Sequence, residues 1–340
     1  MELSRYTDAA EEAVATASGF SGVISVAHGG KQVFVHAAGA ADRAEARPIV
    51  ADTRMGIASG TKLFTALGAM RLIEEGRVGL DSSVVDLLSG ALPQMDRDVT
   101  IRHLLTHTSG FTDYYNEDEN PDADGFFVDI PWYRLESPSD YLPLMKDYPM
   151  LARPGGPFVY NNGGFVILGA VIETVSGEAY RTFVEREVLA RGGMRHSGFF
   201  ALNQLPANTA AGYIDLPDGS WKTNIYNLPI RGGGDGGMFT TAADLAAFWP
   251  AFVSGRIVSP VAAKEMLSPN VRLGERTAYG LGVYLDSARE CCLIVGSDAG
   301  VGFDSRCFAG DDVSITIISN ATDGAEPASE AFYSRLPGDG

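Results

Sequence analysis

Hydrophobic residues recur every three or four positions in several stretches of the chain, which is the pattern of a helix with one buried face. Seven stretches predict helices: residues 3–18, 59–75, 101–106, 162–176, 178–191, 244–252 and 326–336. Gly76 follows the second stretch and Gly177 separates the fourth from the fifth, and glycine commonly ends a helix because it accepts a left-handed backbone. The middle of the chain is therefore predicted to be mainly helical.

A different pattern, closer to alternation, marks both ends of the chain. Residues 22–38 read as a hairpin whose turn is His28-Gly29-Gly30-Lys31, because two glycines supply the positive backbone angles of a tight loop. Near the C-terminus, short runs separated by turn residues predict consecutive antiparallel strands at residues 281–285, 291–296, 302–308 and 313–320.

Strands at both ends with helices between them predict an α/β fold of the α+β type. One antiparallel sheet would be built from both chain ends and flanked by the terminal helices, with a mainly helical region inserted. We expect a single domain over residues 1–340, with its sheet region at about 1–58 and 270–340 and its helical and loop region at about 59–269.

Composition narrows the classes of partner. The chain has 340 residues, 45% of them hydrophobic, and a formal charge of −17. A surface of that charge repels nucleic acid and anionic membranes, so we expect neither as a partner. No stretch is long and apolar enough to insert into a bilayer.

The start of the chain and its cysteines bear on location. Residues 1–19 carry four acids and no apolar run, which predicts no secretory signal. Cys291, Cys292 and Cys307 are an odd set, two of them sequence neighbours on a predicted strand, so a disulfide framework is not expected. Both observations predict a reducing, cytoplasmic location.

Residues 112–147 hold ten acids with aromatic residues interleaved. Such a run is most often a solvated loop, and the alternative is a cap over a cleft. Both readings stay open at the level of sequence.

The candidate chemistry begins with Ser59-Gly60-Thr61-Lys62 at the start of a predicted helix. Residues three apart share a helix face, so the Lys62 amine lies beside the Ser59 hydroxyl and can take its proton if burial keeps the amine partly neutral. Alone, the motif is weak, because serine also caps helices and lysine is usually an exposed helix residue.

Further motifs follow in order. Residues 101–110 read IRHLLTHTSG, residues 154–162 read PGGPFVYNN, residues 236–245 read GGMFTTAADL, and residues 279–282 read YGLG. With the serine motif, these segments resemble the serine β-lactamase-like family, which contains class C β-lactamases, D-alanyl-D-alanine carboxypeptidases, D-amino acid peptidases and related esterases. The resemblance covers nearly the whole chain.

The resemblance implies a role for each matching residue. Ser59 would be the acylating nucleophile, Lys62 the group that keeps it reactive, and Tyr160 the group that exchanges protons with nucleophile, leaving group and water. Asn162 would bind Lys62 and the substrate. Residues 114–116 repeat the tyrosine motif but lack its flanking proline and glycines, so we assign the role to Tyr160.

The family's third motif is altered. Where the family carries Lys-Thr-Gly or His-x-Gly, this chain has Ser297-Asp298-Ala299, so the cation that helps bind a substrate carboxylate is missing. We expect Ser297 and Ala299 beside the substrate, and the backbone N–H groups of Ser59 and Gly300 as the oxyanion hole.

Two arginines, Arg231 and Arg306, are candidates to replace the missing cation at the substrate. His103 and His107 stand four apart like a zinc pair, but no third ligand is evident, and we expect no metal and no cofactor.

The leading hypothesis is a serine hydrolase that forms an acyl-enzyme on a small ester or amide, most simply an esterase. The alternative within hydrolases is a D-alanyl-D-alanine carboxypeptidase or β-lactamase. The alternative of another class is a non-catalytic binding protein that retains the fold.

Overall fold

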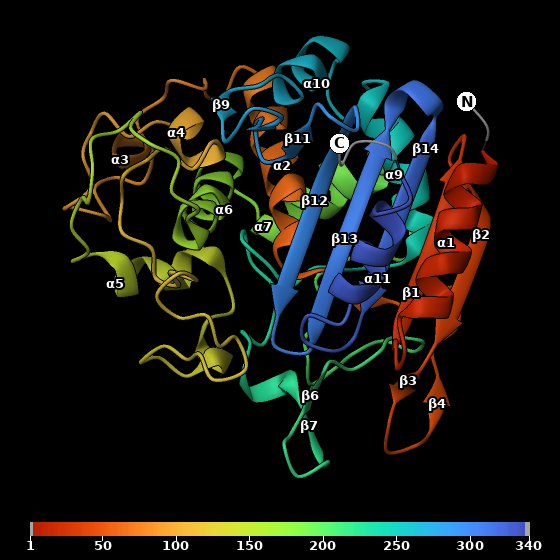
Figure 1. Ribbon diagram of the computed structural model, residues 1–340. Helices are drawn as coiled ribbons and strands as arrows, with labels where there is room; N and C mark the ends of the chain where they lie inside the picture. The colour runs from red at the N-terminus through yellow and green to blue at the C-terminus, as the bar shows by residue number, and fades with distance from the viewer. Residues whose placement is uncertain (1–2, 337–340) are drawn as a thin grey trace.

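The computed structural model describes residues 3–336 and contains an antiparallel sheet of eight strands in the order β2-β1-β14-β13-β12-β11-β10-β9 (Figure 1). The strands of this sheet are β1 Gly22–His28, β2 Lys31–Ala38, β9 Val271–Arg272, β10 Thr277–Tyr279, β11 Tyr284–Asp286, β12 Cys291–Asp298, β13 Val301–Phe308 and β14 Val313–Ser319. Because β14 pairs with both β1 and β13, the two chain ends form one sheet. The predicted fold class is confirmed.

Shorter pairs of strands lie outside this sheet: β3 Ala40–Asp42 with β4 Arg47–Pro48, β5 Met55–Gly56 with β8 Phe239–Thr240, and β6 Tyr213–Asp215 with β7 Trp221–Thr223.

The hairpin predicted at residues 22–38 is present as β1 and β2, and Gly29 and Gly30 have φ angles of 59° and 74° at its turn. The strand predicted at 281–285 is β11, displaced toward the C-terminus. Gly282, at φ 79°, packs so closely on α2 that a Cβ would lie 2.5 Å from the Ala66 Cβ, so this stretch is a loop.

The helices are α1 Ser4–Thr16, α2 Thr61–Glu74, α3 Val84–Leu87, α4 Ile101–Leu105, α5 Leu142–Met145, α6 Asn162–Ser176, α7 Tyr180–Val184, α8 Ala190–Gly192, α9 Ala242–Val253, α10 Pro260–Met266 and α11 Glu326–Tyr333. The predicted helix at 178–191 is interrupted by a π-helical turn at Glu185–Leu189. Gly177 ends α6 in a left-handed conformation, with φ 74°.

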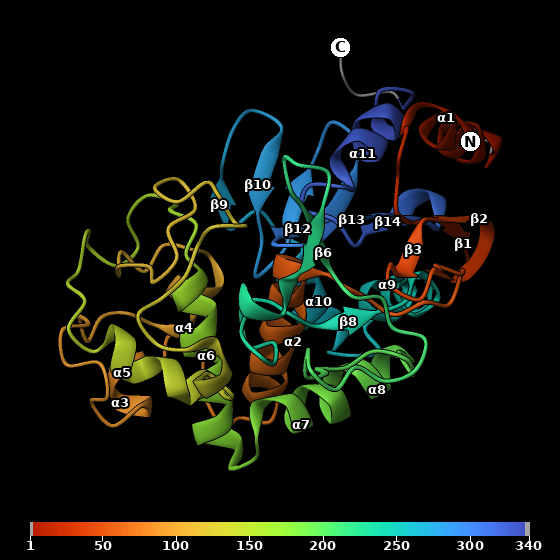
Figure 2. The same cartoon turned by 90° about the horizontal axis from the view of Figure 1, so that it is seen from below.

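The sheet is covered on both faces (Figure 2). The terminal helices α1 and α11 pack on one face, where Tyr6 and Phe332 join a core with the inward side chains of β1 and β14. On the other face, α2 and α9 belong to the larger core, which also contains α6. Helix α2 is buried over most of its length, so it lies between the sheet and the inserted region.

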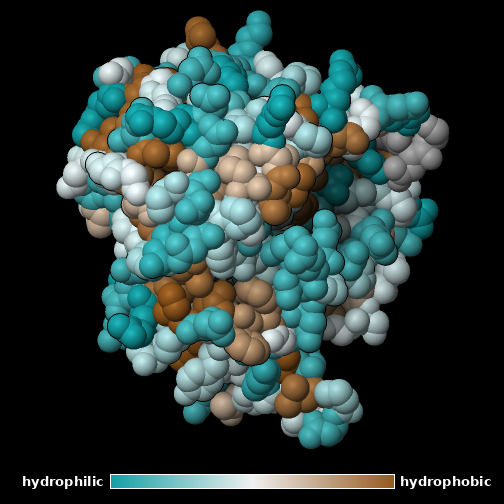
Figure 3. Space-filling view, turned by 90° about the vertical axis from the view of Figure 1, so that its left-hand side faces the viewer, coloured by the Kyte–Doolittle hydropathy of each residue, from teal (hydrophilic) through white to brown (hydrophobic). Residues whose placement is uncertain are grey.

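Segment 112–147 is mostly irregular, with α5 and two short 3-10 turns, and it lies against the N-terminal end of α6. Figure 3 views the side of the molecule that carries it and shows hydrophobic residues interleaved with polar ones. Phe127 is 72% exposed there, whereas Tyr141 is buried. The segment is thus a packed cap on one side and a solvated surface on the other.

No helix of residues 3–336 is long and apolar enough to cross a membrane.

Candidate active site

The serine lies on a tight 3-10 turn, η1 (Ala58–Gly60), that leads directly into α2. Ala58 has a positive φ of 44°, which is costly for a residue with a Cβ and is characteristic of functional turns. Gly60 allows close packing, since a Cβ there would lie 2.4 Å from the ring of Phe303. The turn therefore holds Ser59 at the helix start with little freedom.

Lys62 lies beside the serine, and three acceptors surround its amine. The Nζ atom is 2.8 Å from Ser59 Oγ, 2.7 Å from Asn162 Oδ1 and 2.8 Å from the backbone oxygen of Asp235. The side chain is only 3% exposed. If the amine is neutral, it donates to the amide and the carbonyl, and its lone pair faces the Ser59 hydroxyl.

Burial controls the protonation of this lysine. Loss of hydration lowers the pKa of Lys62 from its ordinary value of 10.5, and the carboxylates of Asp235 and Glu117 partly oppose that shift. The lysine is thus closer to neutrality at physiological pH than a solvated lysine.

Tyr160 completes the group. Its ring centroid is 4.9 Å from Lys62 Nζ and 4.5 Å from the ring of His107. Burial raises the pKa of Tyr160 well above 10, with Glu117 adding to the shift, while a hydrogen bond with Ser59 opposes it. The structure therefore brings Ser59, Lys62 and Tyr160 together, with the tyrosine as a neutral phenol.

His107 packs against the ring of Tyr160. Its Nδ1 accepts the Asn161 N–H at 3.0 Å, and its Nε2 lies 3.2 Å from the Tyr279 hydroxyl. Burial and the nearby Lys62 lower the pKa of His107 well below 6.5, so the ring is neutral.

The other histidine of the predicted pair, His103, has a local partner. Its Nδ1 accepts the Thr100 N–H, 3.2 Å away. Within residues 3–336, no group of three or more potential ligands is arranged for a metal.

Asn162, at the start of α6, links the lysine to the acidic segment. Its Nδ2 donates to the backbone oxygen of Tyr115 and to Glu117 Oε1, each at 2.9 Å. The Asp113 carboxylate accepts the N–H groups of Asn162 and Gly163, each at 2.7 Å. Burial raises the pKa of Asp113 to about 7 despite these bonds. Sequence reasoning missed Asp113 because nothing distinguishes it from the nine other acids of its segment.

The glycine-rich loop of residues 232–237 supplies a second residue that sequence reasoning missed. Asp235 offers its backbone oxygen to Lys62 and accepts the Tyr114 hydroxyl at 2.6 Å with its carboxylate. Tyr114 and Tyr115, the rejected tyrosine motif, are thus structural: Tyr115 stacks on Phe126 with ring centroids 4.0 Å apart.

Strand β12 closes the site from the sheet side. A Cβ on Gly296 would lie 2.4 Å from the Ile57 oxygen and 2.8 Å from the Ser59 nitrogen, so the strand backbone runs directly against the serine turn. β11 pairs with β12 only as far as Leu293, which leaves this end of the strand with an open edge toward the serine.

The prediction for Gly300 is not supported by its position. β12 continues to Asp298, which pairs with Val301, so Ala299 and Gly300 form the turn of the hairpin. The Gly300 N–H donates to Thr322 Oγ1 at 2.8 Å, and a Cβ on Gly300 would meet the backbone of Tyr213. The structure therefore does not bring Gly300 to Ser59.

The register of the same hairpin exposes a different backbone amide. The closing pair of a two-residue hairpin exchanges both ladder bonds, and the next pair points its N–H and C=O groups outward. That next pair is Ser297↔Gly302. The Ser297 N–H therefore points to the open edge of β12, next to the glycine that contacts the serine turn.

The other predicted substrate-binding residues divide into two groups. Ser297 lines the site, and its hydroxyl donates to Asp323 at 2.5 Å. Ala299 is fully buried in the turn and lines no cavity beside the serine.

The two candidate arginines also differ. An outer cleft and a smaller inner pocket open at Ser59, and Arg231 lines neither of them. Arg306 lines the outer cleft, but its guanidinium donates twice to Asp304, at 2.9 and 3.1 Å, and stacks on Tyr333. Its charge is therefore already paired.

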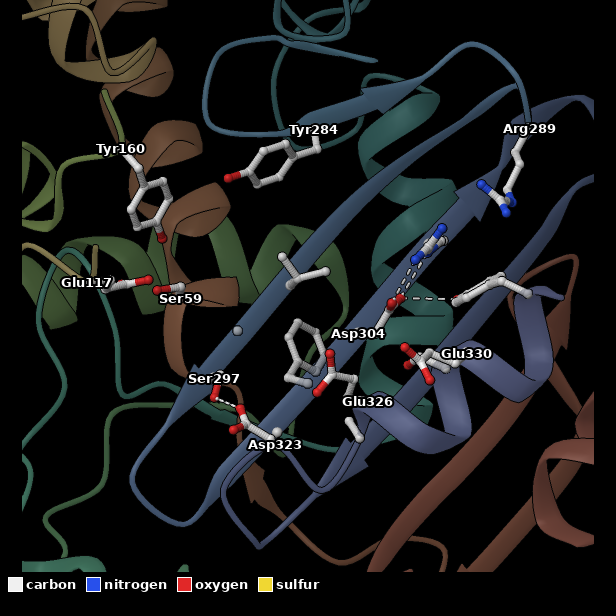
Figure 4. Close-up of a pocket in the computed structure, with 18 of the residues that line it drawn as sticks. Ser59, Glu117, Tyr160, Tyr284, Arg289, Ser297, Asp304, Asp323, Glu326 and Glu330 are labelled. Atoms are coloured by element: carbon white, nitrogen blue, oxygen red, sulfur yellow. Dashed lines mark hydrogen bonds and ion pairs between the residues drawn. The ribbon is translucent and has the colours of Figure 1, made fainter. Parts of the chain in front are cut away.

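Two cavities meet at Ser59. The outer cleft has a volume of about 710 Å³ and extends from Tyr160 and Tyr284 over β12 and β13 to α11 (Figure 4). The inner pocket has about 60 Å³ of room and is enclosed by segment 112–147 and the glycine-rich loop, with Phe126, Trp132 and Asn162 in its wall. Tyr160 lines the outer cleft and is not part of the inner pocket.

Comparison with known proteins agrees with this fold. The model of the β-lactamase family matches residues 7–337, so the chain belongs to the β-lactamase family. It is 30% identical to a penicillin-binding protein of Bacillus subtilis (strain 168) over 298 residues, which are 83% of this chain and 63% of that protein.

Esterase EstB of Burkholderia gladioli is 32% identical over 203 residues, 57% of this chain and 50% of the esterase. Among solved structures, a penicillin-binding protein from Bacillus halodurans superposes with a TM-score of 0.89 at 38% identity, covering 97% of this chain and 99% of that one. The chain thus spans between half and two thirds of the length of these two curated relatives.

Proposed function

We propose that the protein is a serine hydrolase that acts on a small ester or amide through an acyl-enzyme, most simply as an esterase. The observation that carries this proposal is the buried Lys62 amine, held 2.8 Å from Ser59 Oγ by two further acceptors. A lysine in that setting serves as a base for the serine because its neutral form is favoured by burial.

In the proposed acylation, Ser59 Oγ attacks the substrate carbonyl while its proton passes to Lys62 Nζ. The bond from the carbonyl carbon to the leaving atom then breaks, and the neutral phenol of Tyr160 protonates that atom as Lys62 replaces the phenolic proton. The acyl group stays on Ser59, and the leaving group departs with one proton. Water repeats the sequence in the second half of the reaction and releases the acid.

We assign the oxyanion hole to the N–H groups of Ser59 and Ser297. The outward direction of the Ser297 amide and the contact of Gly296 with the Ser59 nitrogen support this pair. Main-chain donors fixed at this point stabilise the charge that develops on the carbonyl oxygen.

We assign the two parts of the substrate, its leaving group and its acyl group, to different cavities. Because Tyr160 protonates the leaving atom and lines the outer cleft but not the inner pocket, we assign the leaving group to that cleft and the acyl group to the inner pocket. The small inner pocket supports a short acyl group.

The test compares the wild-type protein with Ser59→Ala on p-nitrophenyl acetate and p-nitrophenyl butyrate. We expect Ser59→Ala to lose at least a thousandfold in kcat, in the range found when nucleophiles are removed from serine hydrolases. Ser220→Ala, a change at an exposed loop serine, is the control and is expected to keep wild-type rates. Equal rates for the wild type and Ser59→Ala would overturn the proposal.

A D-alanyl-D-alanine carboxypeptidase or β-lactamase is the second candidate, favoured by the names of the penicillin-binding relatives. The pairing of Arg306 with Asp304 speaks against it, because such an enzyme needs a cation for the substrate carboxylate. Labelling by a fluorescent penicillin in the wild type, absent in Ser59→Ala, would favour this candidate over the esterase.

A binding protein without catalysis is the candidate of another class. The convergence of Ser59, Lys62 and Tyr160 speaks against it. A reactive fluorophosphonate that labels Ser59 would exclude it, and absence of labelling would favour it.

We also propose a reducing, cytoplasmic location. Cys291, Cys292 and Cys307 are buried free thiols, and Cys292 lies directly opposite Cys307 in the sheet without a disulfide. Alkylation of the denatured protein taken from cells should modify all three thiols, and a protected pair would contradict this location.

A further inference from the structure

The outer cleft is rich in acids along its length. Six carboxylates and two arginines line it, so acids outnumber cations by four. The carboxylates are those of Glu117, Asp118, Asp304, Asp323, Glu326 and Glu330. Both arginines pair with aspartates: Arg306 with Asp304 and Arg289 with Asp286. The cleft therefore presents a negative field to whatever enters it.

Two of these acids stand on α11 and face the cleft together. Glu326 and Glu330 are four residues apart, hence on one helix face, and Figure 4 shows both side chains at the cleft end opposite Ser59 and Tyr160. Both are exposed, and neither has an ion-pair partner within residues 3–336. Like charges at this spacing weaken a helix, so the folded protein alone gains nothing from the pair.

A hydroxyl between them lacks a partner. Ser329 lines the same cleft and is 8% exposed, and its Oγ atom is buried without a hydrogen bond to any described residue. A buried hydroxyl is ordinarily hydrogen-bonded, and besides donating its proton its oxygen can accept hydrogen bonds through its lone pairs. The unpaired Oγ and the two carboxylates are complementary to a group that donates hydrogen bonds and carries positive charge.

We propose that this end of the cleft binds a cationic ammonium group carried by the leaving group of the substrate, with Glu326, Glu330 and Ser329 as its acceptors. This inference rests on the proposed serine hydrolase activity, and it specifies the substrate class. The leaving group lies here because Tyr160, its proton donor, lines the opposite end of the same cleft.

The ammonium lies well away from the bond that is cleaved. The cleft passes from Ser59 over β12 and β13 before it reaches α11, and neighbouring strands are about 5 Å apart, so the separation is on the order of 10 Å. The preferred leaving group therefore carries its charge on a spacer of several carbon atoms, as in a long aminoalkyl chain or a lysine-like side chain.

The experiment uses S-acetyl thioesters whose leaving thiols end in a protonated dimethylamino group, a neutral isopropyl group or a carboxylate, on spacers of two, four, six and eight carbons. Release of thiol is followed with a disulfide reagent. We expect kcat/KM for the cationic ester to exceed that of its neutral partner by about tenfold on the longer spacers and to approach it on the shortest. The carboxylates should react more slowly than both, and added salt should reduce the preference.

Variants locate the effect. Replacing Glu326→Gln and Glu330→Gln together should reduce the cationic-to-neutral ratio by roughly threefold for each carboxylate removed, and so bring it close to one. Ser329→Ala should reduce it less. Glu45→Gln, the same change at an exposed residue between β3 and β4, should keep the wild-type ratio.

The outcomes separate the inference from the activity on which it rests. Thioester hydrolysis that depends on Ser59 but ignores leaving-group charge at every spacer, or that favours the carboxylate, overturns the inference and leaves the hydrolase intact. Hydrolysis no faster than that of Ser59→Ala overturns both. The spacer series needs only the wild-type protein, so it decides the matter even if an α11 variant fails to fold.

Discussion

At the scale of single residues, the protonation of Lys62 controls the proposed reaction. Its amine has three acceptors in reach, which would suit an ammonium ion, yet burial disfavours that charge. Only the neutral form can take the serine proton, so activity requires deprotonation of a group whose pKa lies below the ordinary 10.5.

This gives the first prediction. The plot of log kcat/KM for p-nitrophenyl acetate against pH should rise through an apparent pKa below 10.5 as Lys62 loses its proton, and no descending limb should appear, because the pKa of Tyr160 is raised well above 10. Lys62→Arg, which stays charged, should lose the activity and the ascending limb. An ascending limb with an apparent pKa at or above 10.5 would contradict the role given to Lys62, and so would a fully active Lys62→Arg variant.

Gly296 gives the second prediction. Its Cβ would intrude on the Ile57 oxygen and the Ser59 nitrogen, both backbone atoms, so Gly296→Ala must displace the serine turn. We expect kcat on p-nitrophenyl acetate to fall at least a hundredfold, in the range for loss of one oxyanion donor. Gly310→Ala has open space around its Cβ and should be neutral. Wild-type activity in Gly296→Ala would show that β12 does not set the position of Ser59.

At this scale the sequence was informative where chemistry defines a motif. Ser59 and Lys62 are identified by residue type and spacing, Tyr160 and Asn162 by the resemblance of residues 154–162 to a family motif, and the fold brings all four together. Gly300 and Ala299 were misplaced because the alternation of a strand does not reveal where the strand ends: β12 extends two residues beyond the predicted end and carries the turn away from the serine.

At the scale of elements, segment 112–147 forms part of the wall of the inner pocket, which we propose as the acyl site. Phe126 stacks on Tyr115 and, with Trp132, lines the inner pocket. The sequence predicted the acidic surface of this segment, but a loop has no periodicity, so its inward residues could not be distinguished from its outward ones.

The pocket leads to a third prediction, on acyl length. With about 60 Å³ of room, the wild type should hydrolyse p-nitrophenyl acetate and butyrate in preference to the octanoate. Phe126→Ala opens the wall and should raise the octanoate-to-acetate ratio of kcat/KM roughly tenfold, the scale of one or two buried methylenes. Phe127→Ala, at the exposed neighbouring position, is the matched control. An unchanged ratio in Phe126→Ala would place the acyl group elsewhere.

At the scale of the whole molecule, strands and helices from both chain ends and helices from the inserted region pack together around one sheet. Phe332 of α11 is fully buried in the core with α1, β1 and β14, while Trp249 of α9 belongs to the larger core on the other face of the sheet. The arrangement of hydrophobic runs predicted this composite fold, because strands at both ends have no other partner of sufficient length.

The fourth prediction tests whether these layers form one cooperative domain. Phe332→Ala should lower the free energy of unfolding by about 3–5 kcal/mol, as expected for a large-to-small change in a core. Urea unfolding curves followed by tryptophan fluorescence and by circular dichroism should shift together, because Trp132, Trp221 and Trp249 all lie in residues 59–269, whereas the substitution lies in α11. Val261→Ala, at a position 78% exposed, should shift neither curve. Two separate transitions would argue for independent domains.

The place of β14 between β1 and β13 also bears on biosynthesis. A ribosome produces the serine turn long before it produces β12, which would complete the proposed oxyanion hole, since the amides of Ser59 and Ser297 are 238 positions apart in the sequence. The hairpin of β1 and β2 gains its further strand partner only when β14 has been made, so a shorter nascent chain cannot complete the sheet. We therefore expect acylating power to arise only after residues 313–319 have left the ribosome, and a shorter nascent chain would leave the cell's esters intact.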